Sequence, residues 1–99
     1  MIRVIYTIRL DPHDLDAFLP AWRQIVRAHA DHGALGSVLL RGDQPDRLLA
    51  ISRWRSRDHW QTHRTDDAHP EAYATFRRVA EVLDRQVFDE IEALEGAAI

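Results

Sequence analysis

The sequence contains no cysteine and no lysine among its 99 residues, so all thirteen basic residues are arginine. The lack of cysteine excludes disulfides, thiolate nucleophiles and cysteine-bound zinc or iron–sulfur sites, and it fits a reducing compartment. The lack of lysine excludes Schiff-base catalysis and the P-loop lysine. No apolar run approaches the roughly 20 residues that cross a bilayer, and the first residues show a strand pattern instead of a secretion signal. We therefore expect a cytoplasmic protein with no membrane partner.

An excess of positive charge is also missing. The net charge is -3, whereas nucleic-acid binding needs a concentrated positive surface, so we expect no nucleic-acid partner. With 45% hydrophobic and 29% charged residues and only four glycines and four prolines, the composition is that of a folded domain. A chain of this length buries only roughly two-thirds of its surface on folding, so a second copy would help to complete the core.

Hydrophobic periodicity predicts the secondary structure. Residues 2–10 alternate between an apolar and a mixed face, which indicates a strand. Asp11 and Pro12 then give an N-cap and a first-turn proline, and the apolar spacing that follows predicts an amphipathic helix ending near residues 29–33. Beyond it we expect strands over 35–41 and 48–55, followed by a short helix capped by Ser56. A longer helix should begin at His69-Pro70, and a last strand should cover about 86–94. The residues expected to be buried on the longer helix are Tyr73, Phe76, Ala80 and Leu83.

This order predicts an α+β, ferredoxin-like β-α-β-β-α-β fold, with a four-stranded antiparallel sheet and both helices on one face. We expect a single domain over residues 1–95 and a frayed tail over 96–99. The other face of the sheet would stay bare, with apolar residues such as Ile5, Leu39, and Leu49 or Ile51. A homodimer through this face, two sheets forming a dimeric α/β barrel, is the expected solution.

Aromatic residues are predicted to line the space between the sheet and the helices. They are Tyr6 in the first strand, Trp22 in the first helix, and Trp60, His63, Tyr73 and Phe76 in the second helical region. Such a lining suits a flat, small aromatic molecule held by a few polar groups. The alternative is that these aromatics simply pack the core, as amphipathic helices commonly do.

His63 is the predicted base, because an imidazole with a pKa of about 6.5 can take a proton from a phenol at neutral pH. A phenolate gives electrons to dioxygen far more readily than the phenol, so no flavin, metal or other cofactor is needed. Tyr6, or alternatively Tyr73, would donate a hydrogen bond to the substrate. The alternative for His63 is a helix-end histidine without a role.

The stretch from Arg53 to His63 carries a family resemblance. Trp54 ends a strand, Ser56 follows two residues later as a cap, Trp60 comes four further on and His63 three beyond that. This pattern, with the order of elements, resembles the antibiotic biosynthesis monooxygenase family of dimeric α/β barrels. The family is functionally mixed, including cofactor-independent monooxygenases of aromatic polyketides, haem-degrading oxygenases and proteins known only by fold.

The resemblance implies a cofactor-independent monooxygenase that acts on a small aromatic or quinol, polyketide-like substrate. The alternative is a non-catalytic ligand-binding or regulatory dimer of the same fold, and a lesser alternative is a haem-degrading oxygenase. Haem-degrading relatives carry an Asn and a Trp where the resemblance places Tyr6 and His63, so their haem triad is not reproduced.

His59 and His63, and likewise His29 and His32, have helical spacings that suit a metal, but no third ligand accompanies either pair and we expect no metal.

Overall fold

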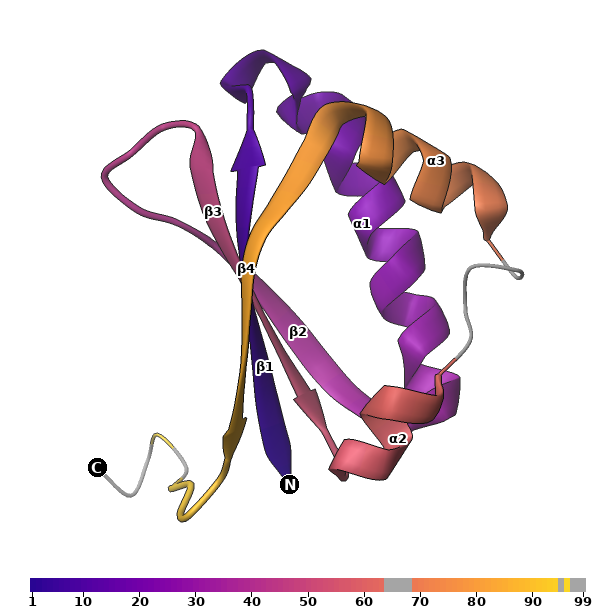
Figure 1. Cartoon of the computed structure of the whole chain (residues 1–99), viewed down its shortest axis with the longest axis vertical. Coiled ribbons are helices and arrows are strands. Elements are labelled where there is room, and N and C mark those ends of the chain that lie inside the picture. Colours follow the sequence, from indigo (N-terminus) through magenta and orange to yellow (C-terminus); the bar gives the residue numbers. More distant parts are fainter. Residues whose placement is uncertain (64–68, 95, 97–99) are drawn as a thin grey trace.

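The strand β1 (Ile2–Leu10) lies inside a four-stranded antiparallel sheet of order β2-β3-β1-β4. The structure is a computed structural model and describes residues 1–63, 69–94 and 96. The other elements are the 3-10 helix η1 (Pro12–Asp14), α1 (Leu15–His29), the 3-10 helix η2 (Ala30–His32), β2 (Ala34–Arg41), β3 (Arg47–Trp54), α2 (Arg57–Thr62), α3 (Pro70–Val79) and β4 (Ala80–Asp89). The helices lie on one face of the sheet and leave the other uncovered (Figure 1). The ferredoxin-like β-α-β-β-α-β prediction is confirmed.

Local side-chain chemistry explains where the helical segments begin and end. The Asp11 carboxylate accepts from the His13 backbone N–H at 2.9 Å and opens η1, and the Ser56 hydroxyl accepts from the His59 backbone N–H at 3.2 Å and opens α2. Gly33 follows η2 in the left-handed conformation, with φ of 95°. None of the helices within the described ranges is long and apolar enough to span a bilayer.

The core fills the space between the covered sheet face and the helices. One cluster joins Ile8, Leu10, Leu48 and Ala50 of the sheet to Phe18 of α1. A second cluster, towards α2, joins Ile2 and Val4 to Trp54 and Trp60. Each large apolar side chain buried here contributes about 1.5–3 kcal/mol to folding. The core residues of β1, which are Ile2, Val4, Ile8 and Leu10, all point to one face of the sheet. The alternation of β1 therefore determines which face the helices cover.

The last helix and the last strand differ from the prediction. Helix α3 ends at Val79, and Ala80 already pairs with Leu10 as the first residue of β4, so the expected strand over 86–94 was placed too late. Leu83, expected in a buried helical stripe, is an exposed strand residue. A bulge opposite Thr7 and Ile8 interrupts the period-two pattern of β4, and pairing along the full length of β1 outweighs the helical propensity of this segment. Residues 95 and 97–99 of the expected domain end and tail lie outside the described residues.

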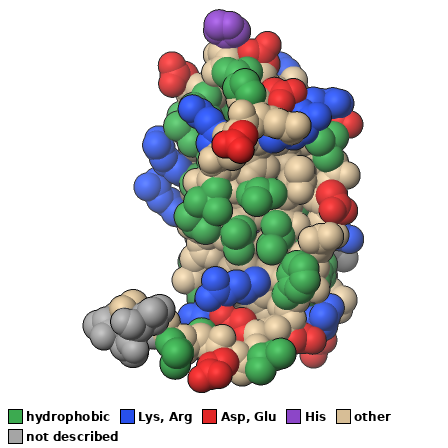
Figure 2. Space-filling view, turned by 90° about the vertical axis from the view of Figure 1, so that its left-hand side faces the viewer, with side chains coloured by type: hydrophobic (Ala, Val, Ile, Leu, Met, Phe, Trp, Pro, Cys, Tyr) green, Lys and Arg blue, Asp and Glu red, His purple; other side chains and the backbone are tan. Residues whose placement is uncertain are grey.

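The uncovered face carries an apolar patch, although its members are partly different from those predicted. Val38, Ile51 and Ile5 are adjacent across three strands, and Leu40 is opposite Leu49 in the next such row. Figure 2 shows hydrophobic side chains gathered in the middle of this face, with arginines above and below. Leu39 was expected here, but it packs against the core cluster of the covered face. A bulge between Ala34 and Gly36 shifts the register of β2, and such a shift exchanges the two faces of a strand.

Candidate functional site

A cavity of about 340 Å³ lies between the sheet and the helices. Its walls are mostly apolar, from Ile8, Trp22, Ile25 and Phe76 among others. Among the described residues, its polar lining is formed by Tyr6, His29, Ser37, Ser52, His63, Tyr73 and Arg77. A largely apolar cavity with a few convergent polar groups is the usual form of a small-molecule site.

Tyr6 supplies a hydroxyl from the floor of the cavity. Its oxygen accepts a hydrogen bond from the indole Nε1 of Trp60 at 3.1 Å. Burial raises the pKa of Tyr6, against the opposing effects of the Trp60 hydrogen bond and the positive charge of Arg85. Tyr6 is therefore a neutral hydrogen-bond donor at physiological pH, with its oxygen already held by Trp60.

His63 lies directly after α2, where the helix ends at Thr62. Its Nδ1 is hydrogen-bonded to the backbone carbonyl oxygen of Trp60. Because a carbonyl oxygen can only accept, Nδ1 must carry the hydrogen, and in the neutral ring Nε2 then has the free lone pair. This contact fixes the tautomer in which Nε2 is able to accept a proton.

The ring of Trp54 lies against two histidines at the same end of the cavity. Its centroid is 4.9 Å from that of His63 and 5.1 Å from that of His29. Trp54 is 1% exposed, and its Nε1 donates to the Ser52 hydroxyl at 3.2 Å. His29 also reaches α3, with Nε2 3.3 Å from the Tyr73 hydroxyl oxygen. The indole is thus anchored on the sheet, with His29 of α1 and His63 after α2 against its ring.

The structure brings most of the predicted site residues together. Tyr6, Trp22, His63, Tyr73 and Phe76 all line the cavity. Trp60 does not: it packs in the sheet cluster behind Tyr6 and contacts the site through that hydroxyl.

Sequence reasoning missed His29, Ser37, Ser52 and Arg77 as lining residues. His29 carries a signal that points to it, because it continues the helical stripe of Trp22 and Ile25 at the spacing of one face. The histidine contacts also differ from the pairs suggested by helical spacing, His59 with His63 and His29 with His32. In the structure His59 Nδ1 is 2.6 Å from the Ser56 hydroxyl, and the ring of His29 lies against that of His63. Ser37 and Ser52 have no distinguishing pattern in the sequence.

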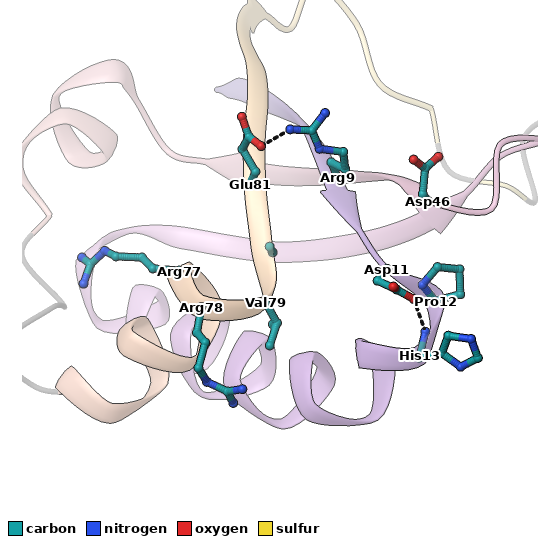
Figure 3. A pocket seen from close by; sticks show the side chains of 10 residues that line it. Arg9, Asp11, Pro12, His13, Asp46, Arg77, Arg78, Val79 and Glu81 are labelled. Atoms are coloured by element: carbon teal, nitrogen blue, oxygen red, sulfur yellow. Dashed lines mark hydrogen bonds and ion pairs between the residues drawn. The ribbon is translucent and has the colours of Figure 1, made fainter.

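A larger hollow of about 710 Å³ lies where β1 ends and β4 begins (Figure 3). Side chains of both signs line it, including Arg9, Arg78, Asp11 and Asp46. Arg9 pairs with Glu81 across it, and the Asp11 carboxylate is engaged by the His13 backbone (Figure 3). Two of its charged side chains, Arg9 and Glu81, already neutralise each other and its lining is more polar, so we place the candidate site in the smaller, apolar cavity.

Comparison with known proteins gives one family and several similar structures. The family model for the antibiotic biosynthesis monooxygenase domain matches residues 1–75. The sequence matches none of the curated proteins with which it was compared.

Two of the similar solved structures are proteins from Streptomyces nogalater and Hahella chejuensis. SnoaB, a cofactor-independent oxygenase from Streptomyces nogalater, is 14% identical, with a TM-score of 0.75 over 94% of this chain and 95% of that chain. HapK from Hahella chejuensis is 17% identical, with a TM-score of 0.76 over 97% of this chain and 98% of that chain. At these identities the likeness establishes the shared fold.

Proposed function

This chain belongs to the antibiotic biosynthesis monooxygenase family, and from that premise we propose that it is a cofactor-independent monooxygenase acting on a small aromatic phenol or quinol. The observation that carries the proposal is the contact between His63 Nδ1 and the Trp60 carbonyl, which leaves Nε2 as a base in an apolar cavity. SnoaB, described as a cofactor-independent oxygenase, has the same fold.

The cavity fits a ligand with a few fused rings. Filled to the usual packing density of about 0.75, a volume of about 340 Å³ holds about 250 Å³ of ligand atoms. Trp22 and Phe76 offer ring faces for stacking, while Tyr6 and Tyr73 offer hydroxyls for a phenol or carbonyl oxygen. We therefore propose a flat aromatic substrate with at least one oxygen substituent.

Catalysis begins with proton removal. His63 Nε2 takes the proton of the substrate hydroxyl or enol, and the electron pair of the broken O–H bond stays on the substrate oxygen. The Tyr6 hydroxyl donates to that oxygen and stabilises the anion, which its raised pKa allows because the phenol remains protonated.

The resulting anion reduces dioxygen itself. For an anthrone-type substrate, one oxygen atom of dioxygen becomes the new quinone carbonyl and the other leaves as water. The two hydrogens lost from the oxidised carbon supply that water, so the substrate provides all the electrons. The roles of the chain's own residues are to bind the substrate, remove the proton and keep bulk water out.

We also propose that the working form is a homodimer through the uncovered sheet face. Val38 is 46% exposed and Phe88 50% exposed on that face, and exposed apolar patches commonly mark a surface that another protein covers. A second copy that covers it with the same patch would form a closed, two-fold assembly.

Oxygen uptake by metal-free protein with a panel of anthrones and naphthoquinols tests the catalytic proposal. We expect uptake above the uncatalysed rate, and a loss of about 100-fold or more in His63→Ala. His59→Ala, an exposed change on α2, is the matched control and should retain the rate. If the protein binds an anthrone and returns it unchanged under air, it is a ligand-binding protein of this fold instead. A Soret band on titration with haem would favour the haem-degrading alternative.

A further inference from the structure

Ser52, towards the end of β3, is a buried polar side chain that lines the cavity. It is 7% exposed, and its hydroxyl oxygen accepts a hydrogen bond from the indole Nε1 of Trp54 at 3.2 Å. Within the residues that the structure describes, the Ser52 hydroxyl makes no second hydrogen bond. Because the indole N–H only donates, the hydrogen of the Ser52 hydroxyl remains available to a ligand oxygen.

Ser37 places a second hydroxyl beside the first. Ser37 of β2 and Ser52 of β3 are directly opposite each other in the antiparallel pair, so their side chains project from the same face of the sheet. Both line the cavity, and Ser37 is half-buried there. Residues opposite each other in such a pair have Cβ atoms about 4.5–5.5 Å apart. One ligand oxygen between the two side chains can therefore contact both hydroxyls.

The serine pair and the Tyr6 hydroxyl lie on different sides of the cavity. The sheet order β2-β3-β1-β4 places Ser37 of β2 and Tyr6 of β1 on either side of β3, roughly 10 Å apart at the usual strand spacing. The Tyr6 hydroxyl is bonded to Trp60, and the Arg85 guanidinium of β4 lies 5.1 Å from the centre of the Trp60 ring. The Tyr6 hydroxyl is thus held towards the β4 side, whereas the serine hydroxyls lie towards the β2 side.

The same kind of contact holds a hydroxyl oxygen at each of the two positions. Trp60 Nε1 donates to the Tyr6 oxygen at 3.1 Å, as Trp54 Nε1 donates to the Ser52 oxygen at 3.2 Å. In both cases the indole occupies a lone pair of the oxygen and leaves the O–H hydrogen unused. The apolar cavity therefore offers two separate donors to the oxygen substituents of one ligand.

We infer that Ser37 and Ser52 form a second oxygen-binding position in the cavity and select aromatic ligands that carry oxygen substituents at two separated positions. This rests on the proposed function and deepens it, because it adds a specificity-determining pair and narrows the ligand class from one oxygen substituent to two. Serine hydroxyls carry no charge, so the group bound here is a neutral hydroxyl or carbonyl. A ligand without that second oxygen leaves the buried Ser52 hydroxyl unpaired, and a site built in this way discriminates against such a ligand.

Calorimetric titration with naphthols under nitrogen tests the serine pair, since no oxidation occurs without dioxygen. 2-Naphthol has one hydroxyl, 2,6- and 2,7-dihydroxynaphthalene have a second on the far ring, and 2,3-dihydroxynaphthalene has its second on the same ring. In the wild type we expect the better far-ring diol to bind about 10-fold more tightly than 2-naphthol. The same-ring diol should gain less than about 3-fold, because its second oxygen does not reach the serines.

The variants remove one hydroxyl at a time. In Ser37→Ala the preference for the far-ring diol should fall about 3- to 10-fold, with the affinity for 2-naphthol unchanged. Ser52→Ala should have the same effect, but it also removes the acceptor of the buried Trp54 N–H. Ser37→Ala therefore decides the matter if Ser52→Ala misfolds. Thr7→Val is the matched control, because Thr7 pairs with Leu49 on the uncovered face, and it should bind every naphthol like the wild type.

Three results would overturn the second oxygen-binding position. They are no binding of any naphthol, equal wild-type affinities for 2-naphthol and both far-ring diols, and a preference that survives in either folded serine variant. The titration is independent of oxygen uptake. A serine-dependent preference without uptake indicates a ligand-binding protein with this second position, whereas uptake without the preference indicates a monooxygenase whose substrate does not use the serines.

Discussion

The indole Nε1 of Trp60 donates a hydrogen bond to the hydroxyl oxygen of Tyr6 at 3.1 Å, which joins α2 to the centre of the sheet. Trp60 itself is 8% exposed and does not line the cavity, whereas Tyr6 does. Because the Tyr6 oxygen accepts from Trp60, the hydroxyl hydrogen is not used in that bond and can be donated to another oxygen. Trp60 is thus a positioning residue for Tyr6.

Replacing Tyr6 separates this role from packing. Tyr6→Phe keeps the ring but removes the proposed donor to the substrate oxygen, so kcat for oxygen uptake should fall roughly 10- to 100-fold. The substitution also leaves the Trp60 N–H without its acceptor, at a cost of about 1–3 kcal/mol in the free energy of unfolding. Trp60→Phe is the comparison, because it keeps the Tyr6 hydroxyl and removes the indole N–H that holds its oxygen, so the fall in kcat should be smaller. Equal kcat in Tyr6→Phe and wild type would remove Tyr6 from the mechanism.

The raised pKa of Tyr6 predicts a loss of stability in alkaline solution. In the unfolded chain the phenol ionises near its ordinary pKa of about 10, while burial raises the pKa in the folded protein. Below pH 10 both states hold the proton and the group has no effect on stability. Above it the unfolded state releases its proton first, so the free energy of unfolding falls as the pH rises towards the folded pKa. Denaturant unfolding from pH 8 to 11 should show this fall in the wild type and a smaller one in Tyr6→Phe, and identical curves would contradict the shift.

Gly33 is predicted to tolerate no side chain. Its φ of 95° disfavours every L-residue, and a Cβ built there would lie 2.5 Å from the His59 ring. Gly33→Ala should therefore lower the free energy of unfolding by about 1–3 kcal/mol. Gly42→Ala is the matched control, since a Cβ there meets nothing within 4 Å and the residue has no positive φ. Urea unfolding of the two variants measures the difference, and equal stabilities would show that the connection between η2 and β2 relaxes without cost.

Local signals explain how much of the fold was predictable. The uninterrupted alternation of β1 and the caps at Asp11 and Ser56 lie within short stretches of sequence, and these elements were predicted where they occur. The start of β4 was not, because its pairing with β1 contains a bulge and its residues favour a helix when considered alone. Leu39 was assigned to the wrong face for a related reason, a bulge in β2 that only the pairing with β3 reveals.

The candidate site was predictable as a set of residue types but not as a set of contacts. Aromatic residues at core-facing positions identified most of the lining, because a strand or helix face can be read from its period. The partnership of His29 with His63 depends on the packing of α1 beside the end of α2, and no spacing along the chain encodes it. The tautomer of His63 depends likewise on a backbone carbonyl, which any residue at position 60 would supply.

Dimer formation through the uncovered sheet face can be tested with one substitution. Phe88 is half exposed on this face and pairs with Arg3 in the sheet, so in a two-fold dimer its replacement by a charged residue enters the interface twice. Phe88→Asp should convert a dimer at micromolar concentration into a monomer, because it would place two carboxylates inside an apolar interface, which is strongly unfavourable. Leu94→Glu is the control: this residue is also exposed but lies beyond β4, and the variant should sediment like the wild type. A wild-type chain that sediments as a monomer would show that the apolar patch stays open to solvent, whereas a dimer unaffected by Phe88→Asp would place the interface on another surface.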